Sequence, residues 1–296
     1  MLTRAILFHL ASGQAFFAGA AGLLLAVALA GRAGQRRGGR AARNLLAGVG
    51  GVLVAASATP LPVAAYGGLA VVTVAWMVGE ARRDRWPRRR VLGLRGLMAA
   101  AWLAAVLAEA PYHLAPRVAA MGRPVLGVIG DSVTAGVGDQ AEVTWPRLLA
   151  DRHGVVVRDH SAPGATAASA ASAQAPAVGP DERLVVVEVG GNDLLAGATP
   201  EAFEAGLARL LDQVRRPGRV VVLLELPLPP TYAAFGRAQR RQARRSGALL
   251  VPKRVLLGIL LADGATLDTI HPSAAGHAQL AEAIWRIIRP AYDAGG

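Results

Sequence analysis

Hydrophobic positions fill the first third of the chain almost without interruption. The apolar runs predict membrane-spanning helices, because the ~30 Å hydrocarbon core of a bilayer needs about 20 apolar residues. The run over 44–79 is too long for one span. Pro60 and Pro62 lie near its middle and break helices, so this run predicts a hairpin of two short spans. The expected transmembrane region, 1–110, contains spans at about 5–30, 45–59, 63–79 and 91–110.

Two arginine-rich segments, 31–43 and 80–90, separate these runs. A cleaved signal peptide is the alternative for the first run, but little charge precedes it beyond Arg4, and further apolar segments follow. Four spans put both arginine-rich segments on one side of the membrane, which the positive-inside rule makes the cytoplasm. The amino terminus and residues 111–296 are then expected on the outer side. Three spans would put the two segments on opposite faces.

After a proline-containing linker over 111–123, the pattern changes to short apolar runs that alternate with helical periods across 124–296. The expected strands are 125–129, 155–158, 183–189, 219–226 and 248–251. The expected helices are 145–151, 166–174, 200–214, 231–246 and 273–289. Such alternation predicts a parallel sheet that is covered by helices on both faces.

Composition agrees with a membrane part, since 53% of the 296 residues are hydrophobic. The net charge of +12 divides unevenly: residues 1–122 carry +11 and residues 123–296 carry +1. The basic charge is therefore a topology signal of the membrane part, and no nucleic-acid partner is expected. Cysteine is absent, which excludes disulfides, thiolate metal sites and a cysteine nucleophile.

Candidate chemistry begins at Ser132, which follows the buried strand 125–129 at the edge where parallel sheets bind ligands. A serine is a weak nucleophile unless a base takes its proton. His271 is the best of the six histidines for this role. It precedes Pro272, which restricts its backbone to extended conformations, and Asp268 is close enough in sequence to hold its imidazole ring.

Four blocks occur in order across the α/β region: Gly130-Asp131-Ser132, Ser161-Ala-Pro-Gly164, Gly190-Gly-Asn192-Asp193 and Asp268-x-x-His271-Pro272. Together they resemble the SGNH, or GDSL, hydrolase family, and within it the bacterial thioesterase/lysophospholipase-type esterases. The resemblance implies a flavodoxin-like three-layer α/β/α fold with no metal and no cofactor. Because these relatives are bacterial, the expected membrane is a bacterial inner (cytoplasmic) membrane, and the outer side that the positive-inside rule gives for the catalytic domain is periplasmic or extracellular.

Carried onto this sequence, the resemblance implies Ser132 as nucleophile, His271 as general base and acid, and Asp268 as the group that orients His271. It further implies an oxyanion hole made by the backbone N–H groups of Ser132 and Gly164 and by the side-chain amide of Asn192. On the residues alone, Gly164 and Asn192 remain open to an ordinary role in turns.

Asp131 and Asp193 are expected to support these turns rather than take part in the chemistry. A basic stripe on the expected helix 231–246 has helical spacing: Arg237, Arg240, Arg241, Arg244 and Arg245. A solvated helix face is the usual meaning of such a stripe. The sharper hypothesis is that it docks on anionic lipid headgroups.

The expected function is that of a membrane-anchored serine esterase. It would hydrolyse carboxylic ester or thioester bonds of lipid-like acyl substrates through an acyl-enzyme. The membrane part departs from the family, whose thioesterase-like members are mostly soluble. Two alternatives remain: an acetylesterase or acyltransferase that acts on envelope polysaccharide, and a vestigial, non-catalytic binding domain.

Overall fold

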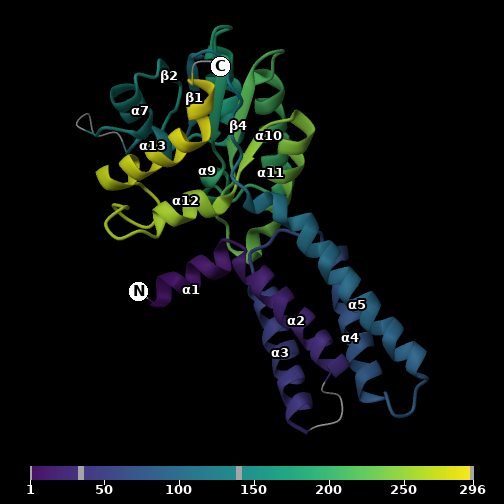
Figure 1. Ribbon diagram of the computed structural model, residues 1–296. Coiled ribbons are helices and arrows are strands. Elements are labelled where there is room, and N and C mark those ends of the chain that lie inside the picture. The colour runs from purple at the N-terminus through teal and green to yellow at the C-terminus, as the bar shows by residue number, and fades with distance from the viewer. Residues whose placement is uncertain (1, 33–36, 138–141, 294–296) are drawn as a thin grey trace. The chain divides into compact units, whose positions relative to one another are not determined.

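The computed structural model describes residues 2–32, 37–137 and 142–293. The chain forms two compact units (Figure 1): a helical unit of residues 1–113 with 229–233, and an α/β unit of residues 114–228 with 234–296. The α/β unit thus begins inside the predicted linker. Its first residues are attached to the last helix, since the Val118 N–H donates to the Ile287 carbonyl.

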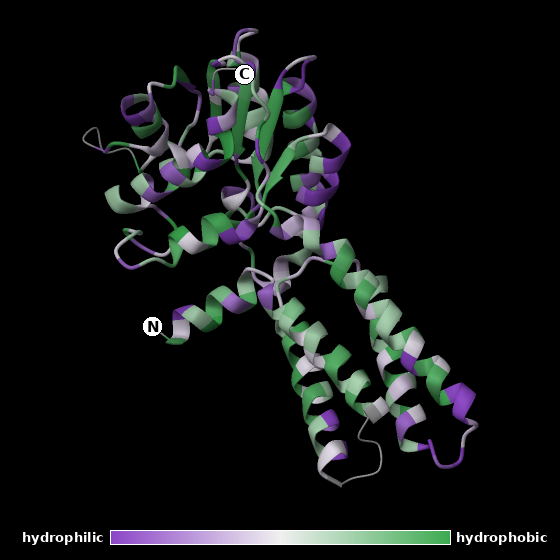
Figure 2. Ribbon diagram, viewed as in Figure 1, coloured by the Kyte–Doolittle hydropathy of each residue, from purple (hydrophilic) through white to green (hydrophobic). Residues whose placement is uncertain are grey.

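The helical unit contains α1 (Leu2–Ala11), α2 (Gln14–Arg32), α3 (Arg37–Ala56), α4 (Val63–Ala81), α5 (Arg88–Glu109) and the 3₁₀ turn η1 (Ala110–His113). The structure corrects the predicted span 5–30. That run is two helices, because the chain breaks at Ser12 and Gly13, where Gly13 has a φ of +88°. Figure 2 shows the predominantly apolar character of α2 and of the helices after it.

Among the described residues, three helices are long and apolar enough to cross a membrane: Gln14–Gly31, Val63–Ala81 and Arg88–His113. The second predicted span, 45–59, corresponds to α3, but this helix begins within the arginine-rich segment and carries Arg40 and Arg43 in its first turns. Unlike α2, α4 and α5, it is not among the three candidates. Residues 33–36 of that segment lie outside the described part of the chain.

Helices α2 and α3 approach each other through two glycines. A Cβ atom at Gly19 would lie 2.5 Å from the Gly50 carbonyl oxygen, and one at Gly50 would lie 2.7 Å from the Gly19 carbonyl oxygen. Neither position therefore accepts a side chain at this separation. Small residues at such contacts are how helices pack closely in membranes.

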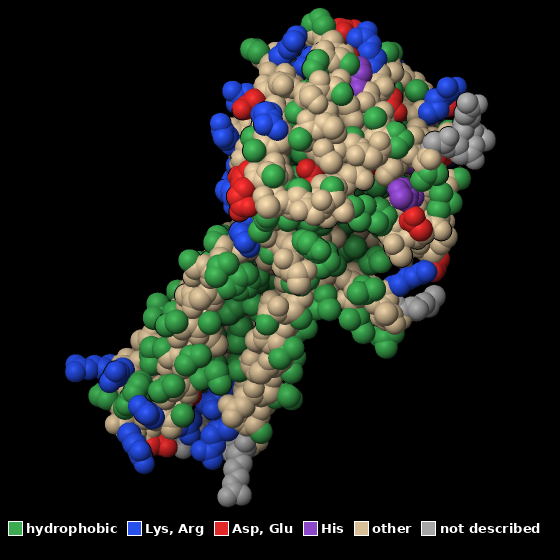
Figure 3. Space-filling view, turned by 180° about the vertical axis from the view of Figure 1, so that it is seen from behind, with side chains coloured by type: hydrophobic (Ala, Val, Ile, Leu, Met, Phe, Trp, Pro, Cys, Tyr) green, Lys and Arg blue, Asp and Glu red, His purple; other side chains and the backbone are tan. Residues whose placement is uncertain are grey.

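An ion-pair cluster joins α3, α4 and α5. Glu80, near the end of α4, accepts from Arg43 Nη1 at 3.1 Å and from Arg95 Nε at 2.6 Å. The start of α3 and the end of α4 therefore lie at the same end of the helical unit, and so do the two arginine-rich segments next to them. The space-filling view in Figure 3 shows basic side chains gathered at one end of this unit.

The α/β unit is built on a parallel five-stranded sheet of order β2-β1-β3-β4-β5. The strands are β1 (Leu126–Gly130), β2 (Val157–Asp159), β3 (Leu184–Glu188), β4 (Val220–Leu224) and β5 (Leu249–Val251). Both β1 and β3 are buried along their whole length, as expected for strands that are covered on both faces. The predicted fold class is confirmed.

Helices cover both faces of this sheet. The longer ones are α7 (Trp145–His153), α10 (Pro200–Val214), α11 (Ala233–Ser246), α12 (Lys253–Leu260) and α13 (Ala274–Ile288). The short elements are α6 (Ser132–Ala135), α8 (Ala167–Ser169), α9 (Gly191–Leu195), the π turn η2 (Ala170–Gln174), and the 3₁₀ turns η3 (Ala175–Ala177), η4 (Pro230–Tyr232) and η5 (Arg289–Ala291). On one face Val128 packs with residues of α7, α12 and α13, and on the other Val187 packs with residues of α8, α10 and α11.

The predicted arginine stripe on α11 is not one solvent-facing surface, which corrects the sequence interpretation. Arg240 is only 4% exposed, and its Nε donates to Glu225 Oε1 at 2.7 Å. Arg241 Nε donates to Glu204 Oε1 at 2.9 Å. Arg240 therefore belongs to the interior of the α/β unit. Because its guanidinium is held in a buried ion pair, it cannot also bind a lipid headgroup.

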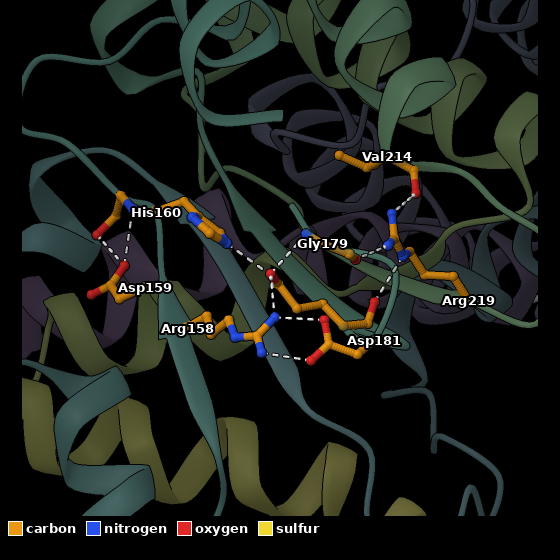
Figure 4. A network of polar contacts seen from close by, with 9 residues as sticks. Arg158, Asp159, His160, Gly179, Asp181, Val214 and Arg219 are labelled. Carbon is orange, nitrogen blue, oxygen red and sulfur yellow. Dashed lines mark hydrogen bonds and ion pairs between the residues drawn. The ribbon is translucent and has the colours of Figure 1, made fainter. Parts of the chain in front are cut away.

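A polar network fastens the segments that precede β3 and β4 (Figure 4). The buried Glu182 receives the Gly179 N–H at 2.8 Å and lies 2.9 Å from His160 Nε2. Arg219 donates to the carbonyl oxygens of Glu182 and Val214 at 2.7 and 2.8 Å. These contacts lie at the amino ends of the strands.

Candidate active site

Three loops meet at the carboxyl ends of β2, β1 and β3, which are neighbours in the sheet. The Ala162 N–H, from the loop after β2, donates to the Gly130 carbonyl at 3.1 Å. The Asp131 N–H, from the loop after β1, donates to the Glu188 carbonyl at 3.2 Å. The predicted blocks around Ser132, Gly164 and Asn192 are therefore brought to one edge, where open α/β sheets bind ligands.

The turn that carries Ser132 is compact. Asp131 caps α6, and its Oδ1 accepts the Val133 N–H at 2.9 Å. Gly130 is required in front of this cap, because a Cβ atom there would lie 2.4 Å from Thr134 Cβ. Ser132 is the first residue of α6 and is half-buried. Asp131 thus holds the first turn of α6.

The loop that carries His271 is held in a hairpin-like form. Thr266 and Pro272 form an antiparallel bridge, and the Leu267 N–H donates to the His271 carbonyl at 2.9 Å. Ser273 then caps α13 by accepting the Gly276 N–H. The extended backbone expected before Pro272 is therefore anchored on both sides.

Within this site His271 Nε2 lies 3.1 Å from Ser132 Oγ, and His271 Nδ1 lies 2.7 Å from Asp268 Oδ2. These are the distances that a nucleophile, its base and the group orienting the base require. The hydrogen bond from the His271 ring, together with backbone N–H groups of His271 and Ile270, holds the pKa of Asp268 far below its usual range. Asp268 is therefore a carboxylate at neutral pH and in mild acid.

The expected oxyanion donors flank this centre. Gly164 has a φ of +77°, a conformation that favours glycine, and a Cβ atom built there would meet nothing within 4 Å. Asn192, on α9, donates from Nδ2 to the Ala165 carbonyl at 3.2 Å, which fixes its amide beside the Gly164 loop. Asp193 Oδ2 accepts the Ala167 N–H at 2.8 Å, so Asp193 supports the same loop.

Sequence reasoning missed two buried residues that shape the site. The Gln174 side chain accepts the Gly130 N–H and donates to the Gly130 carbonyl, both at 3.0 Å. Glu188, 1% exposed, accepts from Thr134 Oγ1 at 3.0 Å. The available signals are weak: one long polar side chain in an Ala/Ser-rich helix, and one acid inside an apolar strand.

Exposed apolar side chains lie within a few residues of the site. They are Val137, Val143, Leu195, Leu267 and Ile270, with Leu195 72% and Leu267 63% exposed. Each lies in a segment that follows Ser132 or Asn192, or that precedes His271. An apolar ligand portion would find contacts in these segments.

Comparison with known proteins defines the class. Residues 128–279 match the GDSL-like lipase/acylhydrolase family, and the matched range contains all four sequence blocks. The chain belongs to this family of hydrolases, which confirms the predicted resemblance.

Among characterised proteins, the chain is similar to the esterase TesA of Pseudomonas aeruginosa, with 32% identity over 179 residues, 55% of this chain and 87% of that protein. It is also similar to thioesterase 1/protease 1/lysophospholipase L1 of Escherichia coli K12, with 30% identity over 155 residues, 49% of this chain and 74% of that protein. The crystal structure of TesA has a TM-score of 0.50 and 34% identity, and covers 56% of this chain and 99% of its own. The chain is thus a hydrolase of the esterase/thioesterase/lysophospholipase type.

Proposed function

We propose that the chain is a membrane-anchored serine esterase that cleaves carboxylic ester or thioester bonds of lipid-like acyl substrates through an acyl-enzyme. The observation that carries the proposal is the continuous contact from Ser132 Oγ through His271 to Asp268, at 3.1 and 2.7 Å. A serine hydroxyl beside a carboxylate-oriented imidazole is the arrangement that activates it as a nucleophile.

In the proposed reaction Ser132 Oγ attacks the acyl carbonyl carbon while its proton passes to His271 Nε2. Asp268 stabilises the resulting imidazolium through Nδ1. The oxyanion receives hydrogen bonds from the Ser132 and Gly164 N–H groups and from the Asn192 amide, each worth about 3 kcal/mol in the transition state. Collapse expels the alcohol or thiol, which takes the proton from His271. A water molecule then repeats the sequence on the acyl-enzyme.

The apolar side chains near the site support a lipid-like acyl group as the substrate portion that is recognised. Val137 and Ile270, 49% and 39% exposed, lie next to the segments that carry the proposed nucleophile and base. Burying one such side chain against an acyl chain contributes roughly 1.5–3 kcal/mol.

Membrane anchoring is supported by the three apolar helices of sufficient length, and the proposed topology takes α3, which packs closely on α2, as a fourth span. The Arg43–Glu80–Arg95 cluster supports a topology in which both arginine-rich segments face one compartment, the cytoplasm by the positive-inside rule. We place the α/β unit on the opposite side, outside the bacterial inner membrane.

The decisive experiment labels the purified full-length protein with a fluorophosphonate probe. Wild type should be labelled, Ser132→Ala should not, and Ser161→Ala should retain labelling, since Ser161 Oγ donates to Asp159 instead of a histidine. A p-nitrophenyl ester series then tests acyl length. Activity on acetate alone would replace the lipid substrate with an acetylated envelope polymer, and an unlabelled, folded wild type would support a vestigial domain.

A further inference from the structure

Two buried carboxyl groups lie next to each other beneath the turn that carries Ser132. Asp131 is 2% exposed and Glu188 is 1% exposed. They are brought together by the sheet: Gly130, which precedes Asp131, is the register partner of Glu188 in the neighbouring strand. The mechanism above uses neither group.

Hydrogen bonds from neighbouring groups reach both carboxyls. Trp145 Nε1 donates to Thr134 Oγ1 at 3.3 Å, and Thr134 Oγ1 donates to Glu188 Oε2 at 3.0 Å. Asp131 Oδ1 accepts the Val133 N–H at 2.9 Å. The remaining contact is between the Asp131 and Glu188 carboxyls themselves. It is attractive only when one proton lies between them.

The electrostatic environment decides which group holds that proton. Burial, followed by the nearby charge of Asp131, raises the pKa of Glu188 well above its ordinary value. Burial and, more weakly, the charge of Asp193 also raise the pKa of Asp131, but the Val133 N–H, the Glu188 carboxyl and the charge of His271 act in the opposite direction. Asp131 is therefore the ionised partner and Glu188 the neutral acid.

We infer that Glu188 is a carboxylic acid that donates its proton to the Asp131 carboxylate. The pair then acts as a single buried negative charge that holds the Ser132 turn and stabilises the His271 imidazolium. Glu188 is a positioning residue in this account, because it acts through Asp131. The imidazolium role rests on the proposed function.

This buried charge complements Asp268. The Asp268 side chain is 55% exposed, so water and salt screen its charge from the surroundings. The Asp131–Glu188 pair is shielded from solvent, and a charge in such a place acts over a longer range. The imidazolium formed during attack by Ser132 would thus be stabilised from two sides.

Two variants separate the charge of the pair from its shape. In Glu188→Gln the amide donates to Asp131 as the acid does, and its oxygen accepts from Thr134, so the single negative charge remains. Asp131→Asn combined with Glu188→Gln keeps the size of both groups and removes the charge. Glu182→Gln is the matched control, since Glu182 is also fully buried but pairs with His160.

The test follows the ¹³C-labelled His271 ring by NMR through a pH titration of the full-length protein in nanodiscs, with His271→Asn for assignment. The pH midpoint of the His271 ring titration should be the same in Glu188→Gln and Glu182→Gln as in wild type. In the double variant, which lacks the buried charge, it should fall by about half a pH unit or more. An unchanged midpoint in the double variant, or an equal fall in Glu188→Gln, would overturn the inference.

Infrared difference spectra of wild type against Glu188→Gln provide a readout that does not depend on the double variant. A protonated-carboxyl band should be present at neutral pH in wild type and lost in Glu188→Gln, and its absence from wild type would contradict the inference. Labelling by the fluorophosphonate reports on the proposed function separately. An unlabelled wild type would contradict the proposed function. The His271 titration and the infrared band would still show whether Glu188 is protonated beside the Asp131 carboxylate.

Discussion

The carboxylate of Asp268 binds His271 at two points. Oδ2 lies 2.7 Å from the ring Nδ1, and Oδ1 accepts the backbone N–H of the same residue at 2.8 Å. One side chain thus fixes both the ring and the backbone of His271. Because these bonds favour the ionised form, the pKa of Asp268 lies far below its ordinary value, and loss of activity in mild acid should not come from protonation of Asp268.

Asp268→Asn should lower kcat by roughly 10²- to 10⁴-fold with a small change in KM, because an amide no longer selects the tautomer that Ser132 needs. Steady-state hydrolysis of the best p-nitrophenyl ester measures this effect. Asp151→Asn, at an exposed position paired with Arg147, is the control. A loss of less than tenfold at Asp268 would show that the carboxylate does not orient the base.

Asn192→Ala should lower kcat by about 10²- to 10³-fold, the usual effect of removing one oxyanion donor. The variant also loses the bond to the Ala165 carbonyl, so thermal unfolding must be measured beside the kinetics. Asn44→Ala in the helical unit is the chemical control. A fall in stability with an unchanged kcat would mean that Asn192 is only a turn residue.

His277 should make the α/β unit sensitive to acid. The ring is fully buried: its Nδ1 accepts the Trp145 N–H at 3.3 Å, and its Nε2 lies 3.0 Å from Glu142 Oε1. Burial lowers the pKa of His277 below its ordinary value, although Glu142 opposes the shift. The unfolded state then binds more protons below about pH 6.5, so stability falls as pH decreases through that region.

Thermal unfolding of the wild type should therefore move to lower temperature between pH 7 and pH 5. His277→Gln should be less stable at pH 7 yet have a flatter pH dependence. Parallel pH curves for wild type and His277→Gln would show that this ring does not titrate on unfolding.

The lack of native cysteine permits a direct test of the proposed topology. Single cysteines at Arg40, Arg85 and Val156 should divide into two classes towards a membrane-impermeant maleimide in right-side-out vesicles. Val156→Cys should react, whereas Arg40→Cys and Arg85→Cys should react only after permeabilisation. Opposite behaviour of Arg40→Cys and Arg85→Cys would contradict the shared side, and reversal of all three would invert the orientation.

The sequence predicted the parts of the fold that have a long repeating pattern. The five strands and α7, α10, α11 and α13 follow from apolar runs, periodicity and turn residues, whereas α12 was not predicted. Helices α6 and α9 are too short to show a period, and the break at Gly13 leaves the run of apolar residues uninterrupted. These features depend on backbone geometry that composition does not reveal.

The site divides in the same way. Ser132, His271 and Asp268 lie in recognisable blocks, and the structure brings them together. The contacts of Gln174 with Gly130 and of Glu188 with Thr134 join residues 44 and 54 positions apart. Arg240 was misinterpreted for a related reason: its helical spacing matches a surface stripe, and only the position of Glu225 shows that it is buried.

The network around Glu182 and Arg219 fastens the sheet at the amino ends of β3 and β4, whereas the site occupies the carboxyl ends. The contacts that stabilise the sheet and the residues of the candidate active site thus lie at opposite edges of the same sheet. The exposed side chains of Val143, Leu195 and Leu267 do not belong to the fastening, so they can be changed with little loss of folding. The α/β unit is therefore a good recipient for side-chain changes at these positions, which would turn the hydrolase towards other acyl chains.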